Sequence, residues 1–420
     1  MKKYKEYINS EIGWIGQIPK NWDIAPIRAL CYLGRGRVIS NEEIANKAGE
    51  YPVYSSQTSE DGLMGRLNTY DFDGEYVTWT TDGANAGTIF YRQGRFNCTN
   101  VCGTLKAKAG KVFPRYLPYV LNLGTKCYVR YDINPKLMNN EMAGIRIPLP
   151  TVEEQKDISR YIDRKTAQID DLIAKKERMI ELLKEERIAV INQAVTKGLN
   201  PKVEMKDFCI EWLGKVPKHW EVKKLKYVSD KVQTGITPPS ERTDYYDGGN
   251  IDWYTPGDFQ ESIQLKNSFR KINRLAIEEG VARMFPSHSV LLIGIGATLG
   301  KVGIIESPSS SNQQINAIIF SDKFNPFFGV YYLQAIANTV ISLSNTSTLA
   351  ILNQTQTKDI LALVPPLEEQ GKIAKYIQSV ELKHSEIVNK EQKQIDLLKE
   401  YRTALIFEAV TGKIDVRNNG

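Results

Sequence analysis

The sequence predicts an α+β fold in which two α/β domains, related by a pseudo-two-fold axis, are separated by a long antiparallel two-helix coiled coil. Three observations lead to this prediction: a repeated tryptophan-containing block, a repeated helical segment, and a stretch of dissimilar sequence after each block. A chain of 420 residues is long enough for two domains of ordinary size, each with its own core.

The composition is that of a globular protein with a mildly basic surface, with 42% hydrophobic residues, 25% charged residues and a net charge of +6. This charge permits a polyanionic partner without requiring one. The N-terminal segment lacks the apolar run of a secretory signal, and the most apolar window is interrupted by glycines and a lysine. The five cysteines are scattered without zinc-binding spacing and fit a reducing compartment. We therefore expect a cytoplasmic protein without membrane association or a metal site.

The first repeated element is WIGQIPKNW at residues 14–22, which returns 198 positions later as WLGKVPKHW at residues 212–220. Trp, Gly, Pro, Lys and Trp occupy the same places in both copies. We interpret the aromatic residues and the proline as packing residues that hold the start of each domain against the helical frame.

The second repeated element is a helix. LPTVEEQKDISRYI begins at Leu149, and VPPLEEQGKIAKYI begins at Val364, which is 215 positions later. Each copy has a proline where a helix can begin and two glutamates in the first turn, where the helix dipole favours negative charge. The larger offset means that the second variable stretch is 17 residues longer than the first.

A heptad pattern runs through both helices and predicts a coiled coil. The seam positions expected in the first helix are 158, 162, 165, 169, 172, 176, 180, 183, 187, 190 and 194. Eight of these eleven are apolar, as are eight of their eleven repeat positions. A helix from Glu153 to Lys197 would be about 67 Å long at 1.5 Å per residue, and it needs a partner for its apolar stripe.

The partner that we expect is the other helix of the same chain, in antiparallel orientation. The seam residues at the two midpoints are Lys176 and Glu391, which would then face each other. We predict that this opposite-charge pair sets the register of the coiled coil. The alternative is that both are solvated charges at the edge of the seam.

The two variable stretches, roughly residues 24–147 and 222–362, have the pattern of mixed α/β domains with many short strands. TTDGANAGTIFYRQGRFNCTN and IGIGATLGKVGIIESPSSSNQQIN share the order of glycine-rich turn, strand and amide-rich loop, which predicts one fold with different loops. GIGATLGK fails both the Walker spacing and the GxGxxG pattern, so we interpret it as a hairpin turn. No methyltransferase motif and no histidine arrangement predicts an active site. We expect no catalytic residue in the chain.

The loops of both stretches carry the residue types that contact nucleic acids. Arg, Lys, Asn, Gln, Ser and Thr read base edges and grip phosphates. The candidates in the first stretch are Arg35, Arg37, Ser55, Ser56, Gln57, Asn85, Arg92, Arg95 and Asn97. The candidates in the second stretch are Thr237, Ser240, Arg242, Lys301, Asn312, Gln313 and Gln314. Taken one at a time, each is also what a plain solvated loop would contain.

The order and duplication of these elements resemble the specificity subunit of a type I restriction-modification enzyme. The resemblance covers nearly the whole chain and is strengthened by TGITPPS, IDWYTPGDF, GATLGKVGI and NQQIN in the second stretch. The first stretch departs from these phrases, with LGRGRVISNEE and NCTN in the corresponding places. The resemblance implies target-recognition domains at residues 1–148 and 200–363 and spacer helices at residues 149–199 and 364–420.

The resemblance also implies a division of labour. Each recognition domain would read one half of a split, asymmetric target in double-stranded DNA, and the helices would fix the unread gap and dock two methyltransferase subunits. S-adenosylmethionine would bind to those subunits, while ATP and Mg²⁺ would serve restriction subunits that translocate and cleave DNA; no cofactor is expected in this chain. Two other classes stay open: an interaction scaffold that binds proteins, and a self-contained methyltransferase or nucleotide-binding enzyme.

Overall fold

The computed structural model describes residues 2–131, 134–210, 212–260, 262–344 and 350–417. The chain divides into two compact units. Unit 1 comprises Met1–Glu177 and Gln392–Gly420, and unit 2 comprises Arg178–Glu391. Each unit contains a sheet-based domain and one stretch of each of the two long helices, so the helices belong to both units.

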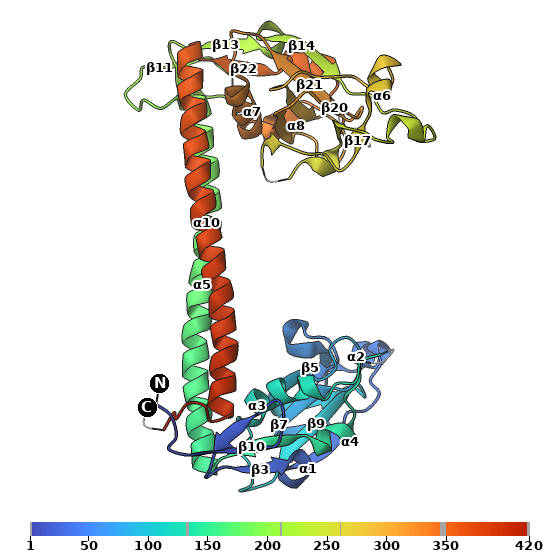
Figure 1. Ribbon diagram of the computed structural model, residues 1–420, viewed down its shortest axis with the longest axis vertical. Coiled ribbons are helices and arrows are strands. Elements are labelled where there is room, and N and C mark those ends of the chain that lie inside the picture. The colour runs from blue at the N-terminus through green and yellow to red at the C-terminus, as the bar shows by residue number, and fades with distance from the viewer. Residues whose placement is uncertain (1, 132–133, 211, 261, 345–349, 418–420) are drawn as a thin grey trace. The chain divides into compact units, whose positions relative to one another are not determined.

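The long helices are α5 (Val152–Lys197) and α10 (Leu367–Val410), labelled in Figure 1. In unit 1, the guanidinium of Arg402 on α10 donates to the carboxylate of Asp170 on α5 at 2.9 Å, and Lys176 donates to Gln394. Rising residue numbers on one helix meet falling numbers on the other, so the two stretches are antiparallel.

The stretches of the same helices in unit 2 pack in the same sense. Arg187 on α5 pairs with Glu381 on α10, and the His384 ring lies 3.2 Å from the Leu183 carbonyl oxygen. The predicted helix bounds and the antiparallel pairing are therefore confirmed within each unit.

The predicted phase of the coiled-coil seam is wrong at two positions of α5. Leu172 is 43% exposed whereas Ile173 is buried, and Thr166 rather than Lys165 is buried. Ile158 and Ile162 belong to the domain core of unit 1, where the helix follows its natural period of 3.6 residues. The seam returns to its predicted positions at Ile169 and again from Lys176 to Ile180.

The domain of unit 1 is built on a six-stranded sheet. The strands, in order across the sheet, are β4 (Cys31–Arg35), β9 (Cys102–Ala107), β7 (Phe72–Thr80), β8 (Ile89–Cys98), β5 (Ala48–Tyr54) and β6 (Leu63–Leu67). The sheet is antiparallel except that β5 pairs with the end of β8 in parallel. Two small antiparallel pairs complete the strands: β1 (Tyr7–Asn9) with β2 (Gln17–Pro19), and β3 (Asp23–Pro26) with β10 (Arg146–Leu149).

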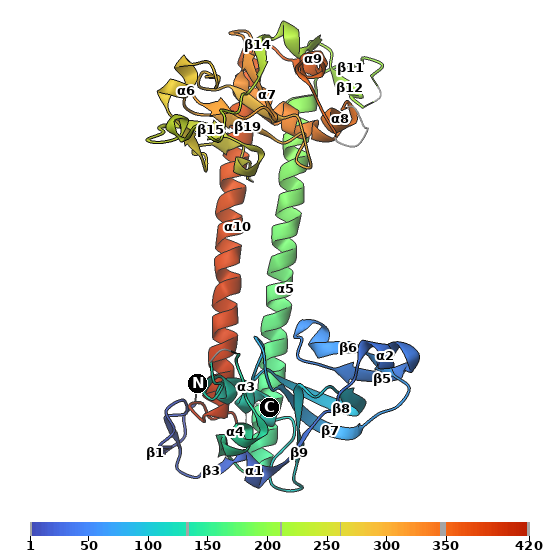
Figure 2. The same ribbon diagram turned by 90° about the vertical axis from the view of Figure 1, so that its right-hand side faces the viewer.

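Short helices surround this sheet. They are α1 (Ile27–Leu30), α2 (Asn41–Asn46), α3 (Leu117–Gly124), α4 (Asn139–Gly144) and two 3₁₀ turns, η1 (Ser59–Gly62) and η2 (Thr125–Cys127). In the view of Figure 2, α2 lies beside β5 and β6.

The domain of unit 2 repeats this plan with a longer variable part. Its main sheet has the order β14 (Ser229–Thr234), β21 (Ile315–Phe320), β18 (Val290–Ile293), β19 (Val302–Ile305) and β16 (Gln264–Leu265). A second sheet has the order β17 (Lys271–Ile272), β15 (Ile251–Tyr254) and β20 (Ser310–Ser311). The two small pairs return as β11 (Met205–Asp207) with β12 (Lys215–Pro217), and β13 (Glu221–Lys224) with β22 (Leu361–Val364).

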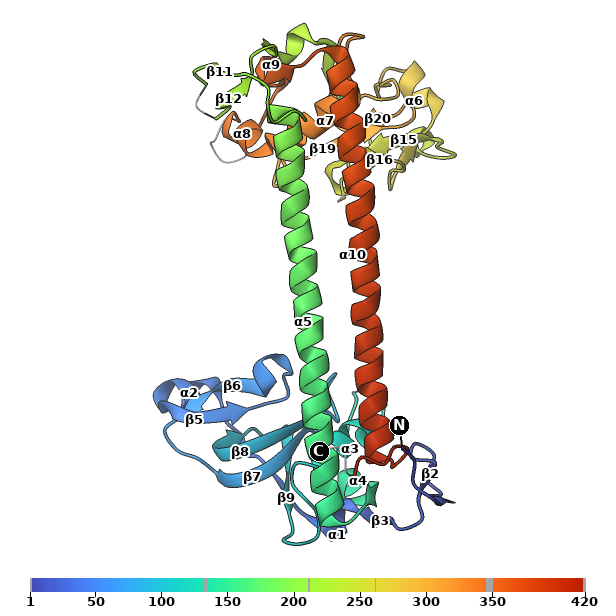
Figure 3. The ribbon, with the colours of Figure 1, turned by 90° about the vertical axis from the view of Figure 1, so that its left-hand side faces the viewer.

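The helices of unit 2 that lie next to the long helices correspond to those of unit 1, whereas the helices of the variable stretch differ. They are α6 (Arg274–Glu278), α7 (Pro326–Ala335), α8 (Ala337–Ser342), α9 (Gln354–Asp359) and the 3₁₀ turns η3 (Leu225–Tyr227), η4 (Thr243–Tyr245) and η5 (Pro256–Asp258). Figure 3 shows α7 of unit 2 beside the upper turns of α5. Among the described residues, none of the helices is long and apolar enough to cross a membrane.

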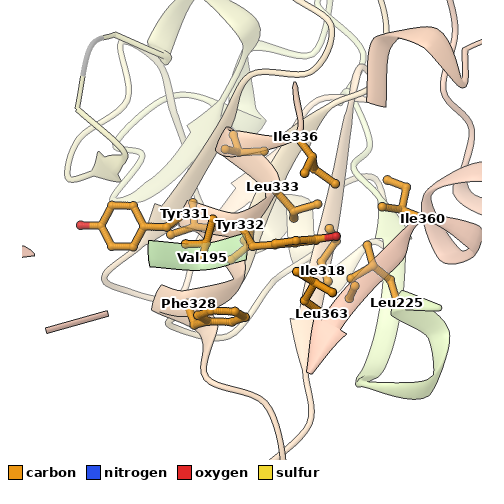
Figure 4. Close-up of a cluster of buried hydrophobic side chains, with 14 of the residues drawn as sticks. Val195, Leu225, Ile318, Phe328, Tyr331, Tyr332, Leu333, Ile336, Ile360 and Leu363 are labelled. Atoms are coloured by element: carbon orange, nitrogen blue, oxygen red, sulfur yellow. The ribbon is translucent and has the colours of Figure 1, made fainter. Parts of the chain in front are cut away.

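The core of unit 2 lies between α7, the main sheet and the ends of the long helices (Figure 4). Phe328, Tyr332 and Leu333 of α7 are buried there with Val195 of α5. The Tyr332 hydroxyl donates to the Leu361 carbonyl oxygen at 2.9 Å, so its only polar group is paired inside the core. The helical frame and the variable domain of unit 2 therefore share one hydrophobic core.

The repeated sequence blocks pack against this frame in both units. Trp22 and Trp220 are each only 2% exposed. A Cβ at Gly412, just past α10, would lie 3.0 Å from the Trp22 ring, and a Cβ at Gly198, just past α5, would lie 3.2 Å from the Trp220 ring. The second tryptophan of each repeated block thus packs against the C-terminal end of a long helix, which agrees with the predicted packing role.

Candidate nucleic-acid interface

The glycine-rich segments of both units form the same hairpin turn. In unit 1 the Thr80 N–H donates to the Thr88 carbonyl oxygen at 3.1 Å, and in unit 2 the Ile293 N–H donates to the Lys301 carbonyl oxygen at 2.9 Å. Four glycines with positive φ shape these turns, at the same spacing in each: Gly83, Gly87, Gly296 and Gly300. The prediction that GIGATLGK is a hairpin turn is confirmed.

A second turn lies directly beside the first in each unit. Thr99–Val101 connects β8 to β9, and Asn312–Gln314 precedes β21. The Thr81 N–H donates to the Val101 carbonyl oxygen at 2.9 Å, and the Gly294 N–H donates to the Gln314 carbonyl oxygen at 2.8 Å. The two domains therefore build both turns on one backbone framework with different side chains.

In each unit, a glycine that follows a strand lies so close to the backbone at the second turn that no other residue fits there. A Cβ on Gly36, after β4, would lie 2.2 Å from the Cys98 carbonyl oxygen. A Cβ on Gly235, after β14, would lie 2.3 Å from the Ser311 carbonyl oxygen. Neither contact leaves room for a side chain, so the glycine holds the strand end against the second turn.

These turns gather with two further segments into one loop cluster per unit. Loop cluster 1 comprises residues 35–37, 55–57, 81–88 and 99–101, and loop cluster 2 comprises residues 234–240, 255–259, 294–301 and 312–314. In cluster 1 the Asn85 side chain donates to the Ser56 carbonyl oxygen at 3.1 Å. In cluster 2 the Lys301 ammonium lies 3.5 Å from the Phe259 carbonyl oxygen.

Five of the nine candidates of the first stretch lie in loop cluster 1 with polar atoms at its surface. They are Arg35, Ser55, Ser56, Gln57 and Asn85. Arg35 is exposed, and its Nε donates to the Asn100 carbonyl oxygen at 2.5 Å, which leaves the rest of its guanidinium fork directed to solvent. A fixed, exposed guanidinium is suited to a phosphate or to a guanine edge.

Two arginines of unit 1 are held by carboxylates. The backbone of Arg37 belongs to loop cluster 1, but its guanidinium pairs with Glu43 at 2.9 Å and with Asp71 at 3.0 Å. Arg95 on β8 lies outside the cluster, pairs with Asp73 at 3.2 Å and stacks over a tyrosine ring. These ion pairs are half-exposed, so they are weak enough to exchange for a polyanion.

Two candidates lie inside unit 1, on strand β8, and not in a loop as expected. Asn97 is fully buried and donates to the Thr69 carbonyl oxygen at 2.8 Å. Arg92 is 5% exposed, lies 3.5 Å from the centre of the Tyr54 ring and donates to the Asp61 carbonyl oxygen. Burial lowers the pKa of Arg92. The two side chains lie on opposite faces of β8, and each is covered separately: Arg92 by the Tyr54 ring, and Asn97 by its pairing with β5 and its bond to Thr69. Neither side chain reaches the surface of cluster 1.

In unit 2 the candidates Thr237, Lys301, Asn312, Gln313 and Gln314 lie in loop cluster 2. Thr237 and Gln313 are exposed and hydrogen bond to each other through their side chains. Asn312 is buried, and its amide donates to Gln314 Oε1 at 3.0 Å, which orients the Gln314 amide. Both clusters present amides and hydroxyls, and they differ in their exposed cation, which is the Lys301 ammonium in cluster 2 and the Arg35 guanidinium in cluster 1.

Ser240 and Arg242 lie at the edge of this cluster and just beyond it. The Arg242 guanidinium donates through Nε and Nη2 to the two oxygens of the Asp244 carboxylate, at 2.9 and 2.7 Å, which occupies one edge of the guanidinium. The Ser240 hydroxyl is exposed and lies 3.3 Å from Glu241 Oε1.

The sequence interpretation missed Thr99 and Asn100 in loop cluster 1. Asn100 is exposed at the tip of the second turn and corresponds in the framework to Gln313. Aligning the glycine pair of each hairpin turn would have placed Thr99–Val101 on Asn312–Gln314, so the signal was present in the sequence. Among the residues described by the structure, no group of His, Cys, Asp and Glu has the arrangement of a metal site.

The sequence profile of the type I restriction modification DNA specificity domain matches residues 19–182 and 217–397, which is most of the chain. A putative type I specificity subunit N-terminus from Mycoplasma pneumoniae is 46% identical over 138 residues, covering 33% of this chain and 74% of that protein. Other curated relatives from the same organism are matched over parts of their own length that range from 38% to 67%. The MjaVIII specificity subunit of Methanocaldococcus jannaschii is 27% identical over 100% of this chain and 98% of its own length.

Two solved structures share the fold. A structure described for complex assembly and conformational transition of the type I R-M system has a TM-score of 0.67 at 16% identity, with 94% of this chain and 99% of that chain covered. The HsdS subunit of Thermoanaerobacter tengcongensis has a TM-score of 0.59 at 16% identity, with 94% and 98% covered. With the profile matching both repeats, the chain belongs to the type I restriction modification DNA specificity domain family.

Proposed function

We propose that this chain is the DNA-recognition subunit of a type I restriction-modification system and that each unit reads one half of a bipartite, asymmetric target. The observation that carries the proposal is the pair of loop clusters: one backbone framework, built twice, presents different exposed side chains in the two units. A duplicated framework with unlike surfaces suits two different half-sites on one DNA duplex.

The side chains of the clusters support direct reading of base edges. Arg35 and Asn100, both exposed in cluster 1, would contact base edges in the major groove, since a guanidinium matches guanine and an amide matches adenine. In cluster 2 the amides of Gln313 and Gln314 offer both donors and acceptors, and Lys301 offers a cation for a phosphate. Arg37, Arg95 and Arg242 would exchange their carboxylate partners for phosphates on binding.

The chain supplies recognition, and we assign catalysis to other subunits. Two methyltransferase subunits that bind S-adenosylmethionine would methylate adenine, and restriction subunits using ATP and Mg²⁺ would translocate and cleave DNA. Such a complex would act in the cytoplasm. Residues 1–148 and 200–363 are proposed as the recognition domains, and residues 149–199 and 364–420 as the spacer helices that set the unread gap.

The pairing of Lys176 with Glu391 is proposed as the register device of these helices. The two residues stand at equivalent seam positions of the two repeated helices, 215 positions apart, and Glu391 is buried. A buried carboxylate is costly unless it is paired, and this is why a partner at the matching position of the other helix favours one register.

Sequence-selective DNA binding by the chain, purified with its methyltransferase partner, tests the proposal. In a gel-shift assay, the complex is expected to bind a labelled duplex that contains the bipartite target. An excess of unlabelled target should compete for this binding, whereas the same excess of scrambled duplex at the same salt concentration should not. Arg35→Ala and Gln313→Ala should weaken that selectivity, whereas Arg66→Ala, a matched exposed residue outside both clusters, should not. Protein capture without any selective DNA binding would instead support the interaction scaffold.

A further inference from the structure

Unit 2 contains a polar pocket of about 550 Å³ beside strand β14, outside loop cluster 2. Its cationic lining residues are Lys226, Lys231, Arg283 and Lys358. One acidic residue, Asp230, also lines it, so cations outnumber carboxylates four to one. The walls come from η3, β14, α9 and the segment before β18, and β14 lies beside α9 in Figure 2.

Arg283 is held in place by the end of β14. Its guanidinium donates to the Thr234 carbonyl oxygen at 2.5 Å, and the side chain is half-buried. The Thr234 hydroxyl in turn accepts from the Gln354 amide at 2.9 Å, and Gln354 also lines the pocket. Because one nitrogen of the Arg283 guanidinium is fixed, its remaining N–H donors are held in one orientation. Oriented donors favour binding of a tetrahedral oxyanion, such as a phosphate group, over a mobile counterion.

The lysines of the pocket are only partly compensated. Lys226 shares the carboxylate of Asp359 with Lys224, at 3.4 and 3.0 Å respectively. Among the residues described by the structure, Lys231 and Lys358 have no carboxylate within ion-pair distance. The pocket therefore carries positive charge that the described part of the chain does not neutralise.

We propose that this pocket binds a phosphodiester group of the DNA backbone, next to the half-site that loop cluster 2 reads. The proposal rests on the proposed DNA-recognition function. Lys231 on β14 and Thr237 beyond its end are six residues apart, at most about 20 Å along an extended chain. That length corresponds to about six nucleotides of one DNA strand along the helix axis. The bound phosphate would fix the position of cluster 2 along the duplex without reading sequence.

Unit 1 does not share this pocket chemistry. Tyr32, which pairs with Lys106, occupies the strand position that Lys231 occupies opposite Ile319. Ala143 is the fifth residue of α4, where Lys358 is the fifth residue of α9. Unit 1 therefore lacks two of the lysines that line the pocket of unit 2, and the two halves of the target should differ in salt sensitivity.

The salt dependence of DNA binding tests this inference with the full chain and its methyltransferase partner. The slope of log K against log salt concentration is negative, and each lost phosphate contact makes it less negative by about 0.9. Lys231→Gln with Lys358→Gln, and separately Arg283→Gln, should each reduce the magnitude of the slope by about that amount, with the preferred sequence unchanged. The control double variant Lys202→Gln with Lys323→Gln removes the same charge at exposed sites outside the pocket and should leave the slope intact.

The possible results separate the inference from the function on which it rests. A wild-type complex without selective DNA binding would overturn both. Selective wild-type binding with equal slopes for pocket and control variants would overturn the pocket assignment alone. Loss of the methyltransferase partner from the pocket variants, seen by gel filtration, would overturn it too, because the cations would then hold an acidic protein surface.

Discussion

The buried glutamine of each EEQ segment is predicted to lock the start of a long helix to its domain. Gln155 and Gln370 are fully buried. Gln155 Oε1 accepts from the Phe113 N–H at 2.7 Å, and its amide donates to the Pro150 carbonyl oxygen at 2.8 Å. Gln370 makes the same two bonds, to Asn325 at 2.7 Å and to Pro365 at 2.8 Å.

Gln155→Leu removes both bonds and keeps a side chain of similar length. It leaves one buried N–H and one buried carbonyl oxygen without a partner, each of which costs about 1–3 kcal/mol. Destabilisation of unit 1 by about 2–6 kcal/mol is therefore expected. Gln370→Leu should do the same to unit 2. Glu153→Gln, at an exposed position of the same turn, is the matched control and should cost less than about 0.5 kcal/mol.

Hydrogen exchange monitored by mass spectrometry separates the two units, which a single unfolding midpoint would not. In Gln155→Leu the Phe113 amide should lose its protection while the Asn325 amide keeps it. Gln370→Leu should give the reverse pattern. Retained protection of Phe113 in Gln155→Leu would refute the assignment of this glutamine as the lock, as would equal loss at both amides.

Three further predictions concern the turns and the helices. Gly36→Ala should displace the second turn of unit 1 and cost about 1–3 kcal/mol or more, because its Cβ meets backbone oxygens. Gly235→Ala should do so in unit 2, with Gly144→Ala, which meets nothing within 4 Å, as the control, and thermal unfolding as the assay. Lys176→Glu and Glu391→Lys should each destabilise the chain, and the double exchange should recover about 0.5–3 kcal/mol in urea unfolding; a double variant no more stable than either single one would contradict the pairing. Deleting one heptad from each long helix should shorten the unread gap while both half-sites stay readable, and an unchanged gap in the methylated sequences would contradict the spacer role.

The duplication and the helical frame were accessible from the sequence because both depend on local pattern. The expected helix from Glu153 to Lys197 differs from α5 by one residue at its start. The glycine turns were also predicted, since positive φ at fixed spacing leaves a readable mark. Two seam positions, 165 and 172, were predicted one residue too early, because the helix next to the domain core follows its 3.6-residue period and not the strict heptad.

The candidate side chains were harder to predict because their orientation depends on long-range pairing. Arg92 and Asn97 were predicted to be surface residues, but Asn97 pairs with β5 and Arg92 is covered by the Tyr54 ring. The cationic pocket could not be seen at all, since Lys226, Arg283 and Lys358 are far apart in sequence and meet only in the fold. Residue type and position in a loop predict which chemical groups a site can offer, whereas the strand pairing in the sheet decides which of these side chains are exposed.

Genome-wide adenine methylation tests most directly whether the two units read separate halves of one target. A cell expressing this chain with its methyltransferase partner should show one bipartite motif with an unspecified gap. Exchanging residues 312–314 for the equivalent turn of another specificity subunit should then change one half of the motif and leave the other half and the gap intact. A contiguous motif, or a change in both halves after the exchange, would contradict the account.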